Sequence, residues 1–598
     1  MHGYHGRYLR IDVSTGEAQV KSLPESAARR FLGGVGLATW LLLRESPARI
    51  DPLAPEAGLV FAFSPLVGTP LTTSAKFAVA AKSPLTDRLN DSLSSSRFAL
   101  SGKRTGADAL LIVGRAERPS LLVIDDGRCR LEPADDVWGL EIPATQEVLR
   151  RRLGPDFDVA VIGPAGERQV RFATISHDRR HAGRGGLGAV MGAKNLKAIA
   201  VAGSHRCTLA DPHAVVAAAK SLSERSFGPA TAKYRELGTV ANLLTFNRLN
   251  VLPTRNFQAG QIDAAEAISG EALHQARQQT RDSCAACTIG CEHVFRSSQG
   301  PVRLEYESLF ALGPLCGITD PDTVLAAARR CDDLGLDTIS TGATIAFTME
   351  CVERGLFDAP SLRFGQTDAL LQTIEKIGQR RGFGDLLAEG TRRLAGRIGG
   401  EAPQFAPHVK GLEIPGYEPR ALQTMALGFA VNSRGADHNR SSAYEVDFSH
   451  RVDRRKVAPS AAVWAVETED KAALMDSLIL CKFLRGVFSD LFAESADLLR
   501  LVTGWNLTAE ELRQTARRIV TAKKLFNIRE GWTPTEDTLP PRFLKQRLPD
   551  GTAPGAELSP ERLEALKTAY YQERGWRPDG DVPCDLVAAL DLTDVMPR

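Results

Sequence analysis

Hydrophobic positions in the first third of the chain occur in runs of four or five residues, which Gly, Pro and Asp interrupt. Runs of this length between turn-forming residues are typical of β-strands, since helices usually need about ten residues. The predicted strands are Leu59–Phe63, Phe77–Ala81, Ala109–Val113 and Leu121–Ile124, and Ile199–Ala202 closes the region. Residues 1–205 therefore predict a strand-rich N-terminal α/β domain.

Beyond residue 205 the hydrophobic spacing changes to that of amphipathic helices. Asp211-Pro212 predicts a helix start, with Asp as N-cap and Pro at the first helical position. The predicted helices are 213–224, Thr323–Leu334, Thr338–Arg354, Ala509–Phe526 and Pro560–Gln572, with a Pro/Gly-rich surface connection at Thr533–Ala556. We expect an α/β (α+β) protein in which two mostly α-helical domains, 206–415 and 416–598, follow the N-terminal domain.

Charge and composition narrow the class of protein. Lys and Arg number 74 and Asp and Glu 72, a net charge of +2, which provides no basic excess for binding nucleic acid. The N-terminus lacks the apolar core of a signal peptide, and no run approaches the ~18 apolar residues of a membrane span. We expect a cytoplasmic protein.

Three of the ten cysteines lie within eight residues, in the spacing C-x2-C-x3-C of Cys284, Cys287 and Cys291. Ten cysteines are too few for a disulfide scaffold in 598 residues, so the group indicates a metal site. A [4Fe–4S] cluster fits this spacing, with a fourth ligand from elsewhere in the fold. Zinc with His293 as fourth ligand is an alternative, although Cys291 and His293 are unusually close for a tetrahedral site, and unliganded cysteines are another.

An acidic motif occurs twice. The segment from Asp332 to Asp337, DDLGLD, is echoed by DSLILC from Asp476 to Cys481. A carboxylate accepts two hydrogen bonds at once from a planar donor edge such as the aminopyrimidinone end of a pterin. Taken alone, each motif is more typical of a solvated helix end, but the second copy ends in a cysteine that could complete the cluster.

A glycine-rich loop, Ala182 to Gly192, precedes a predicted strand at Leu196–Val201. Its glycines allow backbone N–H groups to approach an anion, and Arg184 adds a charge. The loop leads toward a strand, whereas a dinucleotide fingerprint leaves a strand and opens a helix. A single loop of this kind is a weak indication of phosphate binding.

Together these segments resemble the aldehyde:ferredoxin oxidoreductase family nearly end to end. The matching segments are Gly6–Asp12, Phe31–Gly36, Ile162–Gly166, Gly183–Gly192, Leu252–Phe257, the cysteine group, Asp332–Asp337, Ser433–His438, Cys481 and Phe526–Gly531. This combination is far more specific than any one motif.

The resemblance implies a tungsten or molybdenum ion held by the dithiolene sulfurs of two molybdopterins. Such enzymes oxidise aldehydes to carboxylates, or catalyse the reverse reaction, and pass electrons through the cluster to ferredoxin or an iron–sulfur partner subunit. The N-terminal domain would be the base for both pterins, and each helical domain would cover one. Positions matching the family's cofactor contacts are Lys76, Ser95, Ser96, His181, Gly183, Arg184, Asp332, Leu336, Asp337, Asp476 and Leu480.

The resemblance also assigns the metal ligands. Cys284, Cys287, Cys291 and Cys481 match the four cluster ligands, and the backbone carbonyls of Leu93 and Ala182 match those that bind a Mg²⁺ ion between the pterin phosphates.

Glu307 and His438 match the family's catalytic positions. A glutamate in a partly dry pocket can activate water at neutral pH, and a histidine can hydrogen-bond the aldehyde oxygen. We expect the titration of His438 to lie near neutrality. Without the resemblance, the two would be read as a surface carboxylate and a loop histidine.

The sequence departs from the family pattern at several positions. Leu93-Ser-Ser-Ser96 replaces Asn-x-Gly-Gly, Lys76 replaces an arginine that links cluster and pterin, and Ile479 replaces a glycine. Ala326 replaces a glutamate, and no histidine lies within 376–381, so any homodimer would lack the bridging metal of some relatives.

Two other functions remain open from sequence. One is the catalytic subunit of a tungsten-dependent aromatic acyl-CoA reductase, which has a similar scaffold. The other is an electron-transfer or zinc-stabilised binding protein without pterin.

Overall fold

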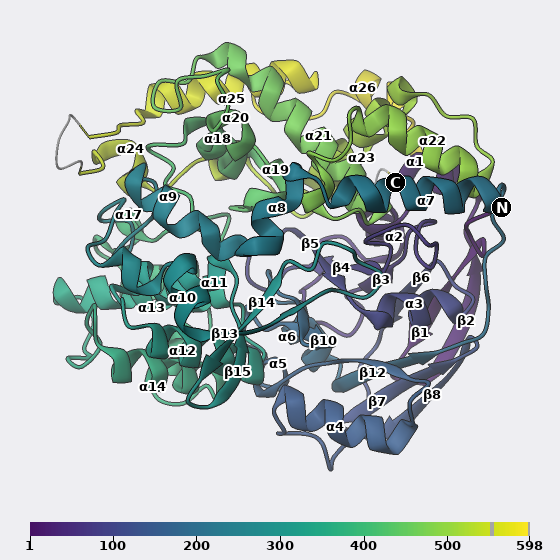
Figure 1. Cartoon of the computed structure of the whole chain (residues 1–598), viewed down its shortest axis with the longest axis horizontal. Helices are drawn as coiled ribbons and strands as arrows, with labels where there is room; N and C mark the ends of the chain where they lie inside the picture. The colour runs from purple at the N-terminus through teal and green to yellow at the C-terminus, as the bar shows by residue number, and fades with distance from the viewer. Residues whose placement is uncertain (550–554, 596–598) are drawn as a thin grey trace.

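In the computed structural model the N-terminal domain contains two six-stranded sheets, and the first of them includes the N-terminal strands (Figure 1). The structure describes residues 1–549 and 555–595. The strand order is β2 (Glu17–Ser22), β1 (Arg7–Asp12), β6 (Ala109–Val113), β3 (Leu59–Ala62), β4 (Lys76–Lys82) and β5 (Leu89–Ser95). Only β1 and β6 pair in parallel in this sheet. The helix α2 (Gly34–Glu45) packs on β3 and β4.

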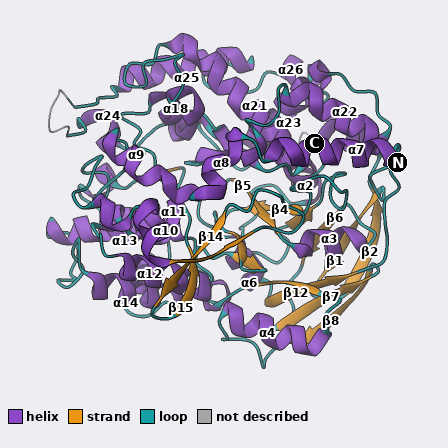
Figure 2. Ribbon diagram, in the orientation of Figure 1, coloured by secondary structure: helices purple, strands orange, loops and turns teal. Residues whose placement is uncertain are grey.

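The second six-stranded sheet packs on the first through a shared apolar core (Figure 2). Its order is β11 (Arg180–Ala182), β10 (Ile175–His177), β9 (Asp158–Val161), β12 (Leu196–Ala202), β7 (Ser120–Asp125) and β8 (Arg128–Pro133). The shared core includes α3 (Arg97–Arg104) and α6 (Leu187–Ala193). On the other face lies α4 (Ile142–Leu153), and α1 (Glu25–Phe31) and α5 (Pro164–Glu167) complete the domain.

The rest of the chain is mainly helical. The helices up to residue 405 are α7 (Pro212–Ser226), α8 (Pro229–Glu236), α9 (Asn242–Arg248), α10 (Gly270–Arg277), α11 (Tyr306–Leu312), α12 (Pro321–Leu334), α13 (Thr338–Glu353), α14 (Thr367–Gly378), α15 (Gly384–Leu387), α16 (Thr391–Ile398) and α17 (Ala402–Phe405). Two small sheets accompany them, made of β13 (Gln278–Asp282), β14 (Glu292–Ser297) and β15 (Gly300–Arg303), and of β16 (His408–Val409) and β17 (Leu412–Glu413).

The later helices are α18 (Gln423–Val431), α19 (His438–Ser441), α20 (Tyr444–Asp447), α21 (Ala462–Leu478), α22 (Leu491–Thr503), α23 (Ala509–Arg529), α24 (Pro541–Lys545), α25 (Pro560–Arg574) and α26 (Cys584–Ala589). The helix α7 packs against α22, so residues 212–226 lie beside the C-terminal helices (Figure 1). No helix in the described part of the chain combines the length and apolarity that a bilayer crossing requires.

The predicted fold class is confirmed: strand-rich sheets come first and helices follow. The predicted strands and helices occur with ends shifted by at most three residues, and the Asp211 carboxylate caps α7 by accepting from the Ala214 N–H at 3.0 Å.

Two expectations need correction. The glycine-rich loop leaves strand β11 and opens α6, whereas we expected it to lead directly to a strand. The segment 533–556 is not simply a surface connection, because α24 lies in it and Asp537 and Phe543 are fully buried; residues 550–554 lie outside the described residues.

Candidate active site

The two acidic motifs occupy equivalent places at the ends of helices. Asp332 lies in the last turn of α12, and Asp476 lies in the last turn of α21. Each helix ends on a left-handed residue, Gly335 with φ 79° and Ile479 with φ 64°. This conformation suits glycine but is uncommon for a β-branched residue, so the surrounding structure must hold Ile479 in place.

A glycine of the N-terminal domain lies against each motif. A Cβ atom on Gly163 would come within 2.4 Å of the Leu334 carbonyl oxygen, and one on Gly34 within 2.4 Å of the Asp476 carbonyl oxygen. Because a side chain at either position would collide with backbone, these glycines let the domain approach both helix ends. The arrangement places both motifs on one base.

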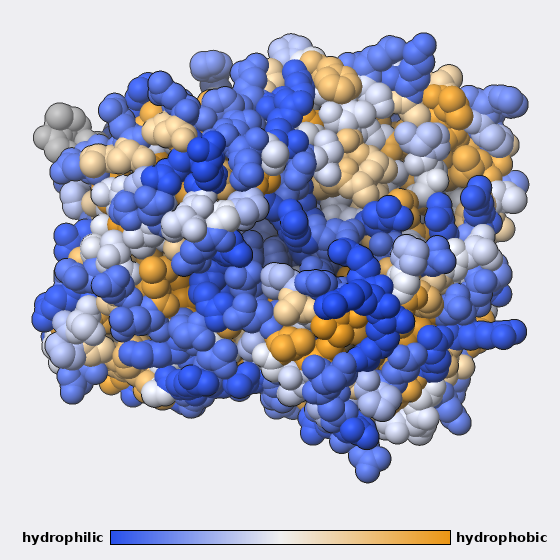
Figure 3. Space-filling model, turned by 60° about the horizontal axis from the view of Figure 1, so that its bottom comes forward, coloured by the Kyte–Doolittle hydropathy of each residue, from blue (hydrophilic) through white to orange (hydrophobic). Residues whose placement is uncertain are grey.

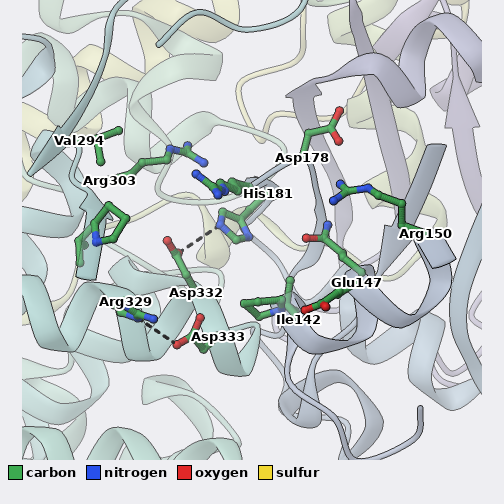
Figure 4. Close-up of a pocket in the computed structure, with 15 residues that line it drawn as sticks. Ile142, Glu147, Arg150, Asp178, His181, Val294, Arg303, Arg329, Asp332 and Asp333 are labelled. Carbon is green, nitrogen blue, oxygen red and sulfur yellow. Dashed lines mark ion pairs between the residues drawn. The ribbon is translucent and has the colours of Figure 1, made fainter. Parts of the chain in front are cut away.

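The first motif opens onto a cleft. The Asp332 carboxylate lies 3.2 Å from Nε2 of His181 (Figure 4). Nδ1 of the same ring lies 2.7 Å from the Ser176 hydroxyl. The cleft has a volume of about 560 Å³, and its lining comes from α4, the β10–β11 turn, the β14–β15 hairpin and α12. Figure 3 shows the lower part of the molecule turned forward, with a hollow bordered mainly by hydrophilic side chains.

The second motif is more enclosed and lies among cations. The Asp476 carboxylate is 2.9 Å from Nζ of Lys482 and 3.3 Å from Nη1 of Arg440, and its Oδ2 atom is buried without a hydrogen bond. Arg440 also contacts the buried Asp91 carboxylate, and Lys523 lies 3.5 Å from that carboxylate. Burial raises the pKa of Asp91, but Arg440 and Lys523 outweigh it and lower that pKa to about 2.

Arg184 of the glycine-rich loop lies close to the end of the first motif. It donates to the backbone carbonyls of Ala436 and Glu413 at 2.7 and 2.5 Å, and it lies 3.5 Å from Asp337. The Asp337 carboxylate caps α13 and accepts from the Ser340 hydroxyl at 2.6 Å. Asp337 is therefore engaged within the protein, whereas Asp332 is 36% exposed and Oδ2 of Asp476 makes no hydrogen bond among the described residues.

Leu93 and Ala182 lie on strands that pack against each other, β5 and β11. The Ser92 hydroxyl ties the strands further by donating to the Arg184 carbonyl at 3.0 Å. The hydroxyls of Ser95 and Ser96 are already engaged, the first with the Ala75 carbonyl and the second as the N-cap of α3. A Cβ atom on Gly183 would meet nothing within 4 Å, so this glycine borders open space.

Leu336 and Leu480 hold the turns of the two motifs. Both side chains are buried, and each backbone N–H donates back into the preceding helix, to the carbonyls of Cys331 and Met475 at 2.8 Å. These residues fix the shape of the motifs.

Four half-buried cysteines lie near one another at the base of the second motif. Charges on Cys284 and Cys481 raise the pKa values of Cys287 and Cys291 further, beyond the larger effect of burial. The two loops meet at Thr73, whose N–H donates to the Ala286 carbonyl at 2.6 Å and whose hydroxyl accepts from the Cys481 N–H at 3.3 Å. Among the described residues, no three His, Cys, Asp or Glu side chains are close enough to hold a single metal ion.

His293 is engaged by another segment. Its Nε2 atom lies 3.3 Å from the Tyr234 carbonyl, and burial lowers the pKa of its ring. Cys481, by contrast, acts electrostatically on both Cys287 and Cys291, which favours it over His293 as a fourth ligand and favours the iron–sulfur interpretation over zinc.

Lys76 lies between the cysteines and the second motif. Burial lowers its pKa, but the charges of Cys481, Cys284, Asp476 and Cys287 have a larger combined effect and raise it. Lys76 therefore carries a positive charge beside all of these groups, although it lacks the bidentate geometry of an arginine.

Glu307 and His438 form a buried pair near Arg184. Nδ1 of His438 lies 3.6 Å from Oε1 of Glu307, and both atoms are buried without a hydrogen bond among the described residues. Oε2 of Glu307 accepts from the Gly416 N–H at 3.0 Å. Burial raises the pKa of Glu307 to about 8 and lowers that of His438 to about 3. Our expectation that His438 titrates near neutrality was wrong, because burial disfavours the imidazolium.

Sequence reasoning missed several charged residues of this region: Arg434, Arg440, Lys482, Lys523, Asp91 and Asp437. Together with Arg184, Asp337 and Asp476, these six residues form a charged group of five cations and four carboxylates. Arg440 and Lys482 could have been suspected, since each lies within two residues of a predicted site residue. The excess positive charge and the unpartnered Nε of Arg434 suit an anionic ligand.

Comparison with known proteins gives consistent results. The family model described as "Aldehyde ferredoxin oxidoreductase, N-terminal domain" matches residues 8–203, and the one for its "domains 2 & 3" matches residues 215–592. The chain is 38% identical to a tungsten-containing aldehyde ferredoxin oxidoreductase of Pyrococcus furiosus, covering 99% of this chain and 100% of that protein. It is 37% identical to the protein of the same name from Thermococcus kodakarensis, with 100% of both chains covered.

A solved structure shows the same fold. The active-site complex BamBC of benzoyl coenzyme A reductase aligns with a TM-score of 0.83 over 99% of this chain and 98% of that one, at 22% identity.

Proposed function

The chain belongs to the aldehyde ferredoxin oxidoreductase family and is an oxidoreductase, and we propose that it interconverts aldehydes and carboxylates at a tungsten or molybdenum centre. The oxidation takes one water per aldehyde and yields a carboxylate, two electrons and three protons. Two relatives that are 37–38% identical to this chain are named tungsten-containing aldehyde ferredoxin oxidoreductases. The single structural observation that carries the proposal is the Glu307–His438 pair, whose facing atoms Oε1 and Nδ1 lie 3.6 Å apart without a hydrogen bond among the described residues.

Glu307 is the proposed general base. A carboxylate with a pKa near 8 is a stronger base than an exposed one, and it is partly ionised near neutral pH. Its Oε2 atom is held by the Gly416 N–H, which leaves Oε1 free to take a proton from water that attacks the aldehyde carbon.

His438 is the proposed hydrogen-bond donor to the aldehyde oxygen. The Asn439 side-chain amide lies 2.9 Å from Nε2, and an amide N–H donated there makes Nε2 the acceptor. The neutral ring then carries its proton on Nδ1, the unpartnered atom on the Glu307 side. This proton can stabilise negative charge as it develops on the substrate oxygen.

Two molybdopterins are the proposed ligands of the metal. Asp332 and Asp476 would accept hydrogen bonds from their aminopyrimidinone ends, while Arg184, Arg434 and Lys523 would balance their phosphates. The carbonyls of Leu93 and Ala182 would bind Mg²⁺ between these phosphates. The metal centre, when bound, takes up the two electrons of each oxidation.

Electrons would leave through a [4Fe–4S] cluster held by Cys284, Cys287, Cys291 and Cys481, with ferredoxin or an iron–sulfur subunit as acceptor. Lys76, between these cysteines and Asp476, would link the cluster with the second pterin electrostatically.

The alternative is reduction of an aromatic acyl-CoA. The likeness to the benzoyl coenzyme A reductase complex is a likeness of fold at 22% identity, so aldehyde oxidation remains the function that we propose.

The test is anaerobic purification followed by metal and pterin analysis and an activity screen. We expect about one tungsten or molybdenum and about four irons per chain, with dye reduction by aliphatic or aromatic aldehydes. Protein with full metal and pterin that acts on benzoyl-CoA and on no aldehyde would instead establish the alternative. Protein without pterin would contradict both.

A further inference from the structure

Arg303 is a largely buried cation that the proposed mechanism does not use. It ends strand β15, and its side chain, 14% exposed, points into the cleft toward His181 and Asp332 (Figure 4). Its Nη1 atom is buried and has no hydrogen-bond partner among the described residues. Since an unpaired buried guanidinium N–H is unfavourable, this atom indicates an acceptor supplied by a ligand.

Arg303 shares its nearest carboxylate with a second arginine. The Glu292 carboxylate forms ion pairs with both Arg303 and Arg180. Arg180 is also 3.9 Å from Glu305, which is more exposed. One buried carboxylate thus serves two arginines, and the Asp332 carboxylate, which lines the same cleft, lies 3.2 Å from Nε2 of His181.

We propose that Arg303 is a recognition residue for the pterin that Asp332 holds. The aminopyrimidinone edge of a pterin carries amino and ring N–H donors next to a carbonyl oxygen. Asp332 can accept from the donors, and the Arg303 guanidinium, which lines the same cleft, can donate to the carbonyl oxygen. This inference rests on the proposed function, because it requires that a pterin occupies the site.

The second motif offers a comparable arrangement. There, Lys482 and Arg440 lie directly beside Asp476, at 2.9 and 3.3 Å. Asp476 therefore has cationic donors beside it, and Asp332 shares its cleft with one, none of which a motif identified. At Asp332 this donor comes from a hairpin, and at Asp476 it comes from the segments that follow the catalytic histidine and the last cluster cysteine.

The experiment compares Arg303→Met and Arg303→Lys with Arg329→Met as a matched control. Arg329 lines the same cleft, but it pairs with Asp333 at 3.6 Å and is 34% exposed. In the Arg303→Met protein, Glu292 keeps its ion pair with Arg180, so no carboxylate is left unpaired. Pterin per chain is measured after oxidation to its fluorescent form, and pterin release from the anaerobic holoenzyme is timed in mild denaturant.

We expect Arg303→Met to release pterin about tenfold faster, or to retain less of it, because a charge-assisted hydrogen bond is lost. Arg303→Lys should be intermediate, since a lysine lacks the fork geometry, and Arg329→Met should match the wild type. Wild-type content and release rate in Arg303→Met would overturn the inference. If that protein does not fold, wild-type behaviour of Arg303→Lys would overturn it. Wild-type enzyme without any pterin would overturn the proposed function instead.

Discussion

Nδ1 of His438 lies 3.6 Å from Oε1 of Glu307, and neither atom has another partner among the described residues. Burial keeps His438 neutral and most of the Glu307 carboxyl protonated at neutral pH, since the pKa of Glu307 is raised to about 8 and that of His438 is lowered to about 3. The pair is therefore mostly uncharged at neutral pH, and only the ionised fraction of Glu307 can take a proton.

Replacement of Glu307 by Gln should reduce aldehyde oxidation by about 10²-fold or more, the usual contribution of a general base. Gln retains the volume and can still accept from the Gly416 N–H, so substrate binding should change less than turnover. The measurement is steady-state dye reduction in protein with verified metal, iron and pterin contents. Full activity at normal cofactor content would show that Glu307 is not the base.

Wild-type activity should rise with pH and level off above about 8, because the base must be ionised. His438 should add no limb near neutrality, since the pKa of its ring is about 3. The same shift on Glu307 favours the folded state fully below the ordinary pKa of 4.5, and this stabilisation is lost as the pH rises through about 8. The residual activity of Glu307→Gln should lack the rising limb, whereas an unchanged profile would contradict the assignment.

Most of the fold could be predicted from local patterns. The strand Ala109–Val113 is apolar over its whole length, and the capped start at Asp211 was clear, because both signals lie within a few consecutive residues. The helix α6 was missed because its seven residues include two glycines and carry no polar face. The buried Asp537 was missed because its partners, Lys410 and Lys524, approach it only in the folded chain.

The residues of the candidate site likewise divide into those that local sequence patterns predict and those that depend on the folded structure. Motifs identified Asp332 and Asp476, but no local pattern identifies Arg303, whose role depends on a hairpin brought beside α12 by tertiary packing. The pKa of His438 depends on its depth of burial, which a loop sequence does not specify. Contacts between residues far apart in the sequence, and the loss of solvent around buried groups, could not be predicted from the sequence patterns.

Replacement of Cys481 by Ser should remove or degrade the [4Fe–4S] signal, although the residue lies far along the chain from Cys291. Serine is a poor substitute for a thiolate ligand. Iron content and electron paramagnetic resonance of the reduced protein are the measurements. Cys584→Ser, at an exposed cysteine, is the control and should match the wild type. Unchanged iron and spectra in Cys481→Ser would remove this residue from the ligand set.

Replacement of Asp332 or Asp476 by Ala should lower bound pterin and metal, with a larger effect at Asp476. Asp332 is 36% exposed, whereas Asp476 is 2% exposed and its loss leaves Lys482 and Arg440 without this carboxylate. Unsatisfied pterin donors should cost about 1–3 kcal/mol at either site. Pterin and metal per chain are measured, and the unfolding of the apoproteins is measured as a control for stability. Full cofactor content in both variants would refute the proposal that the two acidic motifs bind pterin.

Replacement of Lys76 by Met should make the cluster harder to reduce. The positive charge of Lys76 lies beside Cys481, Cys284 and Cys287, and it stabilises the extra electron of a reduced cluster held by these cysteines. Its removal should shift the reduction potential to more negative values, on the order of tens of millivolts, because charges at partly buried sites are only partly screened. Lys76→Arg is the matched control, since it keeps the charge and restores the residue that the family pattern favours at this position. Redox titration followed by electron paramagnetic resonance should show the shift in Lys76→Met and little change in Lys76→Arg. Equal potentials in all three proteins would mean that Lys76 does not act on the cluster through its charge.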